Sequence, residues 1–535
     1  MNDISQVTPV TLKSWIHDGD EIALLDVREH GQYGEEHLFY VVSIPYSKLE
    51  IEVQRLVPRK TVRLVLIGGS ETELTDKARQ RLFEMGYSNI HVLEGGVPAW
   101  RAAGFEVFAG VNLPSKAFGE LAEHAFNTPR ISAQELNDKI VNKENIVVLD
   151  GRPYSEYKKM SIPTAVCCPN GELPLRIDDI VKDPDTTIVI NCAGRTRSII
   201  GAQTLINLGI PNKVLALENG TQGWFLEDLQ LNHGDTKRHP LHVAKENLAA
   251  RQRRAKTLAE NYGIKFVDGA QVKEWLKEKD RTTFLCDVRT PEEFESGTIP
   301  GAQHSPGGQL VQATDQYVGV KGARIVVFDQ ENVRAPAMAT WLTMLGWEVV
   351  VCENALTFPW VPESKADTLL TQKNVPTPEL EIKSIEASEI ISMVQKGSVL
   401  IDIRPSMKYR ESHIKDAQWS IRPKLSVIAD KFKNQKVILI AEDDLMAKLA
   451  AKDLIEFGAQ QISINTETKE QWVHAGLEVN GSPSNPPDEA CIDYLFFVHD
   501  RHDGNKAAAR QYLAWEMNLL KQIDQQERES FRFKH

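Results

Sequence analysis

The chain has 535 residues, of which 42% are hydrophobic and 25% charged, and its formal net charge is −12. This composition is typical of a globular protein of several domains, and the acidic balance argues against nucleic acid or an anionic membrane as the main partner. No apolar run reaches the ~18 residues of a membrane helix, and the start of the chain lacks a secretory signal pattern. The six cysteines show no disulfide framework, so we expect a cytoplasmic protein.

One pattern occurs four times along the chain. Each copy has an apolar run closed by Asp-x-Arg, with the aspartates at Asp26, Asp150, Asp287 and Asp402. Each copy then has a helical segment that ends in glycine, and a tryptophan. Counting seventeen residues back from each glycine gives one loop position per copy: Gly69, Cys192, Asp329 and Ala441. The tryptophans follow these positions by 31, 32, 31 and 31 residues. The chain is therefore four copies of one unit of about a hundred residues.

Short apolar runs alternate with helical patterns inside each unit. This alternation predicts the α/β class, with a mostly parallel sheet flanked by helices in each unit. In such sheets the working crevice lies at the carboxyl ends of the strands. The predicted divisions are unit one at 1–111, unit two at 125–234, a connecting helix at 235–260, unit three at 261–363, unit four at 379–480 and a C-terminal extension at 481–535.

Polar segments are expected between the units, at 112–130 and 364–378. In the extension, residues 494–498 predict a strand. Residues from Asn505 to about Glu527 predict one amphipathic helix, whose apolar face carries Leu513, Met517 and Leu520. The His- and Asp-containing segment 499–504 is interpreted as a polar turn rather than a metal site, so no metal and no cofactor are predicted.

The most informative stretch surrounds Cys192. A β-branched run ends at this cysteine, and a helix is predicted to follow, with Ser198 as its N-cap and Gly209 at its end. Cys192 would then lie in a loop that opens into a helix N-terminus, where unpaired N–H groups favour an anion. Arg195 and Arg197 add two cations to the same loop. We therefore expect Cys192 to be a thiolate at neutral pH and to act as a nucleophile.

These motifs together resemble the rhodanese domain, a sulfurtransferase fold whose active-site loop begins at a catalytic cysteine. Besides the loop, unit two has Asp-x-Arg followed by a carboxylate and an aromatic residue, and the ending Glu-x-Gly-x-x-x-Trp. The matching residues are Asp150, Arg152, Glu156, Tyr157, Glu218, Gly220 and Trp224. The resemblance covers nearly the whole chain except the last fifty-odd residues, and the chain is similar to bacterial proteins with several tandem rhodanese-like domains.

The resemblance implies a double displacement through Cys192. A donor such as thiosulfate would leave its outer sulfur on Cys192 as a persulfide, and this sulfur would pass to cyanide or to a thiol, which a protein could also supply. Backbone N–H groups would hold the persulfide, and the two guanidinium groups would hold the anionic donor. The expected substrate-binding residues are Ala193, Gly194, Arg195, Thr196 and Arg197.

The other three units depart from this pattern. Gly69, Asp329 and Ala441 occupy the cysteine position, and none of them can form a persulfide. Their loops also carry carboxylates where unit two carries arginines, which would repel an anionic donor. We interpret these units as catalytically silent. They would cover surface, shape access to Cys192 or dock a partner.

Three residues are candidate accessory residues. Asp150 and Arg152 are expected to form a structural ion pair rather than to take part in the chemistry. Cys168 could accept sulfur from Cys192 or form a resolving disulfide, although a packing role is the favoured interpretation. Two other functions stay open: a sulfur- or redox-sensing scaffold in which Cys192 carries sulfur once, and a phosphatase or arsenate reductase. A related fold uses Cys-x5-Arg for phosphate, and the Cys-x4-Arg found here is one residue shorter.

Overall fold

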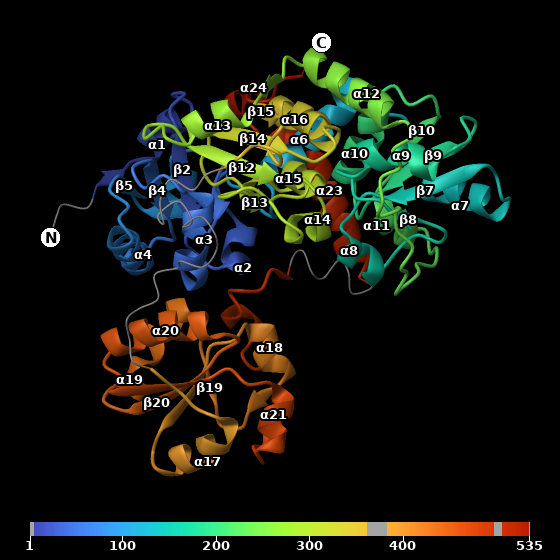
Figure 1. Ribbon diagram of the computed structural model, residues 1–535. Coiled ribbons are helices and arrows are strands. Elements are labelled where there is room, and N and C mark those ends of the chain that lie inside the picture. The colour runs from blue at the N-terminus through green and yellow to red at the C-terminus, as the bar shows by residue number, and fades with distance from the viewer. Residues whose placement is uncertain (1–4, 361–381, 497–504, 534–535) are drawn as a thin grey trace.

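The computed structural model describes residues 5–360, 382–496 and 505–533. These residues form four five-stranded sheets, one per unit, and all strand pairings within them are parallel. In units one to three the strand order is first, fifth, fourth, second, third, and helices flank each sheet (Figure 1). The predicted α/β class with four parallel, helix-flanked sheets is confirmed.

The first two units have the same succession of elements. Unit one contains β1 (Gln6–Val7), α1 (Pro9–Ile16), β2 (Ile22–Asp26), α2 (His30–Glu35), β3 (Val42–Ser43), α3 (Leu49–Leu56), β4 (Arg63–Ile67), α4 (Glu73–Glu84), β5 (Ile90–Leu93) and α5 (Gly96–Ala102). Unit two contains β6 (Arg130–Ile131), α7 (Ala133–Val141), β7 (Ile146–Asp150), α8 (Tyr154–Lys159), β8 (Val166–Cys167), α9 (Leu173–Ile180), β9 (Thr187–Asn191), α10 (Thr196–Asn207), β10 (Val214–Leu217) and α11 (Gly220–Leu226).

The last two units repeat this plan with small changes. Unit three contains β11 (Lys265–Val267), α13 (Gly269–Trp275), β12 (Thr283–Asp287), α14 (Pro291–Glu295), β13 (Gln303–His304), α15 (Gly307–Gln312), β14 (Arg324–Phe328), α16 (Arg334–Met344) and β15 (Glu348–Cys352). Unit four contains β16 (Lys383–Ser384), α17 (Ala387–Gln395), β17 (Val399–Asp402), α18 (Ser406–Glu411), β19 (Gln418–Trp419), α19 (Ala429–Phe432), β20 (Lys436–Ile440), α20 (Asp444–Glu456), β21 (Gln461–Asn465) and α21 (Lys469–His474). A separate antiparallel pair joins β18 (His413–Ile414) to β22 (Val479–Asn480).

The Asp-x-Arg motif has the same structural role in all four units. Each aspartate is fully buried at the end of the second strand, and its arginine binds it at 2.6 Å. The same guanidinium donates to a backbone carbonyl ten residues beyond the aspartate, such as that of Met160 in unit two. Asp150 and Arg152 therefore form the structural ion pair that the sequence predicts, and this pair fastens the chain after α8 to the end of the sheet.

The segments between the units are more structured than their polarity predicts. Residues expected to be a polar connection contain α6 (Leu113–Phe126), which buries more than half of its side chains. The connecting helix α12 covers Leu248–Asn261, so the first half of the predicted range 235–260 is not helical. The predicted linker at 364–378 lies outside the described residues. One apolar core runs through units one and three, α6 and the C-terminal residues.

The extension differs from its prediction in three ways. Residues 494–496 do not form a strand, and 497–504 lie outside the described residues. The single predicted helix is divided into α23 (Lys506–Gln522) and α24 (Gln525–Glu529). Met517, expected on the apolar face, is 51% exposed, whereas Leu513 is buried. In Figure 1 the red helix α23 lies in the upper body beside unit two, away from unit four, which precedes it in sequence.

Unit four attaches to unit one through buried ion pairs (lower part of Figure 1). Arg422 binds both oxygens of Glu50 at 2.6 and 2.7 Å and also binds Asp453. Arg81 reaches the same aspartate at 2.7 Å. None of the described residues of unit four lines the Cys192 cavity described below.

Candidate active site

Cys192 follows β9 directly and lies 2% exposed in a cavity of about 390 Å³. Helix α10 begins at Thr196 with Arg195 as its N-cap, three residues before the N-cap that the sequence predicts. Ser198 is therefore not the N-cap. Its hydroxyl lies inside the first turn and donates to Cys192 Sγ at 3.2 Å. A hydroxyl donor aimed at sulfur stabilises negative charge on that atom.

The loop is held from the other side by the start of α11. The Thr221 N–H donates to the carbonyl of Cys192 at 2.8 Å, and the Gln222 N–H donates to the carbonyl of Ala193 at 3.1 Å. Gly220 has a φ of 52°, and a Cβ there would lie 2.2 Å from the Cys192 carbonyl oxygen. Only glycine allows this approach, which explains why the Glu-x-Gly motif accompanies the cysteine loop.

Both loop arginines line the cavity, and both are already paired with carboxylates. Arg197 binds the two oxygens of Glu156 on α8 at 2.7 and 2.8 Å. Arg195 binds Glu120 on α6 at 2.7 and 3.0 Å and also contacts Glu123. Burial raises the pKa of Glu120 to about 6, even though Arg195 acts to lower it. The basic loop is therefore close to neutral in its folded surroundings.

The rest of the cavity wall comes from parts of the chain that sequence reasoning did not connect with Cys192. The residues from outside unit two are Val111, Asn112, Lys116, Gln309, Gln312, Ala313, Gln316, Tyr512 and Glu516. They belong to the segment after unit one, to unit three and to α23. The apolar spacing in 113–126 could have revealed α6, but no local signal links residue 516 to residue 192.

The other cysteines are placed differently. Cys168 is fully buried in the core of unit two and is not among the cavity-lining residues. Burial raises its pKa well above the ordinary value and raises that of Cys167 to about 12. The same cause raises the pKa of Cys286 to about 12 and that of Cys352 to about 11. This placement favours packing over sulfur chemistry for Cys168.

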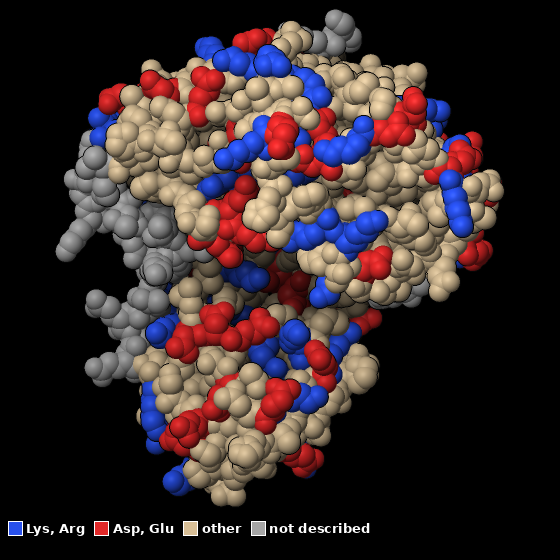
Figure 2. All heavy atoms as spheres, turned by 45° about the vertical axis from the view of Figure 1, so that its right-hand side comes forward, with Lys and Arg blue, Asp and Glu red and all other residues tan. Residues whose placement is uncertain are grey.

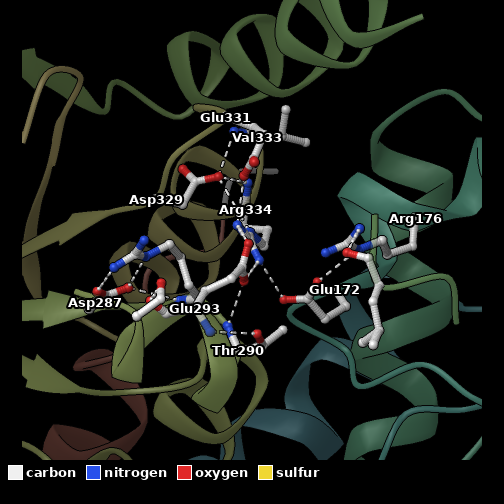
Figure 3. Close-up of polar contacts among 12 residues, drawn as sticks. Glu172, Arg176, Asp287, Thr290, Glu293, Asp329, Glu331, Val333 and Arg334 are labelled. Carbon is white, nitrogen blue, oxygen red and sulfur yellow. Dashed lines mark hydrogen bonds and ion pairs between the residues drawn. The ribbon is translucent and has the colours of Figure 1, made fainter. Parts of the chain in front are cut away.

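In unit three, backbone N–H groups of the corresponding loop bind the side-chain carboxylate of Asp329 (Figure 3). Asp329 occupies the cysteine position, and its carboxylate accepts the N–H groups of Val333, Arg334 and Ala335 at 3.2, 3.1 and 3.3 Å. Arg334, which corresponds to Arg197, is fully buried and binds Glu293 at 2.6 Å. The loop between β14 and α16, together with the first turn of α16, therefore binds negative charge at the position that Cys192 has in unit two.

Comparison with known proteins agrees with this arrangement. A family model described as "Rhodanese-like domain" matches residues 8–103, 132–227, 268–357 and 386–475. The chain belongs to the rhodanese-like family. The crystal structure of thiosulfate sulfurtransferase from Pseudomonas aeruginosa is 35% identical in sequence, covers 99% of both chains and gives a TM-score of 0.88.

Two shorter stretches of similarity link this rhodanese-family chain to curated proteins. The Allochromatium vinosum protein named "Sulfurtransferase" is 30% identical over 94 residues, which are 18% of this chain and 85% of that protein. YrkF of Bacillus subtilis (strain 168), named only provisionally as a sulfur carrier, is 30% identical over 103 residues. That match is 19% of this chain and spans about half, 54%, of YrkF.

Two features bear on membranes and metals. Within the described ranges, no helix combines the length and the apolar character needed to cross a bilayer. In the same part of the chain, no three His, Cys, Asp or Glu side chains gather as metal ligands would. On the face in Figure 2, basic and acidic side chains are interspersed.

Proposed function

We propose that this chain transfers sulfane sulfur from thiosulfate or a similar anionic donor to cyanide or a thiol, through a persulfide on Cys192. The observation that supports this most directly is the position of Cys192 Sγ. It lies in a cavity, accepts the Ser198 hydroxyl and stands where the loop of unit three holds a carboxylate. Ala193 to Arg197 form the rim that would hold donor and persulfide.

The first step forms an S–S bond between Cys192 and the outer sulfur of thiosulfate. The bond between the two thiosulfate sulfurs breaks, and sulfite leaves with its electron pair. In the second step, cyanide or a thiolate attacks the terminal sulfur of the persulfide. The Cys192 sulfur then takes back its electron pair as a thiolate, so no external oxidant or reductant is needed.

Silent unit three and helix α6 have a structural place in this proposal. Unit three supplies the wall that carries Gln309 and Gln316, and α6, which follows unit one, supplies Lys116. The ammonium of Lys116 lies 4.6 Å from the ring centroid of Trp515, which fixes a cation in the wall. For unit three, shaping the access to Cys192 is the role that fits these contacts best.

The test is intact-mass analysis after thiosulfate treatment, followed by peptide mapping. We expect a gain of one sulfur atom, located on Cys192, and repeated thiocyanate formation when cyanide is added. A single equivalent of thiocyanate would instead favour the sensing scaffold. Sulfur gain on another cysteine, or none at all, would refute the proposal.

A further inference from the structure

Two side chains in the cavity wall are buried, and each has at least one polar atom without a hydrogen-bond partner among the described residues. Gln222, on α11, is 4% exposed, and Glu516, on α23, is 3% exposed. Among the residues that the structure describes, neither polar atom of the Gln222 amide has a hydrogen-bond partner, and Glu516 Oε2 has none either. Buried polar groups are nearly always satisfied. Unsatisfied ones that line a cavity therefore indicate where a ligand supplies the missing partner.

The two side chains converge on one point of the cysteine loop. A Cβ built on Gly194 would lie 3.2 Å from Glu516 Oε2 and 3.9 Å from Gln222 Nε2. The other carboxylate oxygen, Glu516 Oε1, accepts the Thr196 hydroxyl at 3.1 Å, which leaves Oε2 directed at this point. The backbone of Gln222 is held in place because its main-chain N–H donates to the carbonyl of Ala193. The pair thus faces Gly194, two positions after Cys192 in the sequence, and lines the same cavity.

The unsatisfied atoms define the chemistry of the missing ligand. A carboxylate oxygen accepts hydrogen bonds and attracts a cation, whereas the Gln222 amide both donates and accepts. Thiosulfate and cyanide have no hydrogen to donate to Glu516. A primary ammonium group has three N–H donors and a positive charge, and so supplies donors to Glu516 Oε2 and Gln222 Oε1, while a thiol sulfur on the same molecule is a weak acceptor for Gln222 Nε2.

We propose that Glu516 and Gln222 make this cavity selective for an amino thiol, a small thiol with a neighbouring ammonium group, as the sulfur acceptor. The inference rests on the proposed function, because the acceptor must meet a persulfide on Cys192. The ammonium binds Glu516, and the thiol, after losing its proton to solvent, attacks the terminal sulfur. An S–S bond forms on the acceptor, and the S–S bond to Cys192 breaks to regenerate the thiolate. The C-terminal extension thereby completes the site of unit two.

The test uses the full-length protein loaded with sulfur from thiosulfate. Single-turnover transfer is measured with cysteamine, which carries an ammonium, and with 2-mercaptoethanol, which carries a hydroxyl instead. The native protein is compared with Glu516→Gln. The matched control is Glu529→Gln, which removes an exposed carboxylate from the same extension. Each thiol has the same intrinsic reactivity toward every variant, so the ratio of native to variant rates isolates the contribution of the cavity.

We expect Glu516→Gln to lower the ratio of the cysteamine rate to the 2-mercaptoethanol rate by about tenfold or more. Glu529→Gln should leave this ratio near that of the native protein. If Glu516→Gln leaves this ratio unchanged, the inference is overturned. Sulfur loaded on Cys192 would in that case still support the proposed function. A native protein that takes up no sulfur overturns both. If Glu516→Gln fails to load, Gln222→Met provides the same comparison.

Discussion

Replacing Arg197 by alanine tests whether the paired loop arginines still bind the donor. The Arg197 side chain is 14% exposed, lines the cavity and holds both oxygens of Glu156. Loss of a charge-assisted hydrogen bond weakens binding by ~1.5–3 kcal/mol, and each 1.4 kcal/mol is about tenfold. We expect kcat/KM for thiosulfate to fall by about 10- to 100-fold. Glu156, whose charge Arg197 no longer offsets in this variant, adds repulsion toward an anionic donor.

This repulsion can be separated from the lost contact by a second substitution. In Arg197→Ala combined with Glu156→Gln, the carboxylate charge is gone, so part of the lost thiosulfate activity should return. The assay is the initial rate of thiocyanate formation at varied thiosulfate, with Arg101→Ala as the control because Arg101 is a 55% exposed arginine of unit one. Unchanged kcat/KM in Arg197→Ala, or an equal loss in Arg101→Ala, would refute the assigned role of Arg197.

Three further outcomes are expected. Cys192→Ser should abolish thiocyanate formation and sulfur uptake, and activity that survives would place the chemistry on another residue. Arg334→Met should lower the free energy of unfolding by ~3–5 kcal/mol, the scale of a broken buried ion pair. The reason is that the substitution leaves Glu172 and Glu293 without their shared cation. A chemical denaturation curve like that of the native protein would contradict this expectation. Burial acts to raise the pKa of Glu293, but the hydrogen bonds and the charge of Arg334 lower this pKa to about 2. The stabilisation by ionised Glu293 is therefore complete above its ordinary pKa of 4.5. It should be lost as the pH falls toward 2. Glu293→Gln should flatten that part of the stability profile, and identical profiles would exclude the effect.

Part of the site could be predicted because it is local. Cys192 lies within a few residues of a strand end and of a helix start, so a β-branched run, a glycine and a helical period are enough to place it. The helix start itself was misplaced, because Ser198 is a common N-cap residue type but here directs its hydroxyl to sulfur. The pairing of Asp150 with Arg152 was also predictable, since the partners are two positions apart at one strand end.

The sequence by itself determined four repeated α/β units and a single unit with a cysteine at the strand tip, because both depend on period and spacing along the chain. Only the tertiary structure decided what surrounds that cysteine. Thr196 and Glu516 are 320 residues apart, and Arg195 and Glu120 are 75 apart, yet each pair is in hydrogen-bond contact. Such contacts depend on which helix faces dock, which follows from shape and burial over the whole molecule and leaves no periodic signal in the sequence.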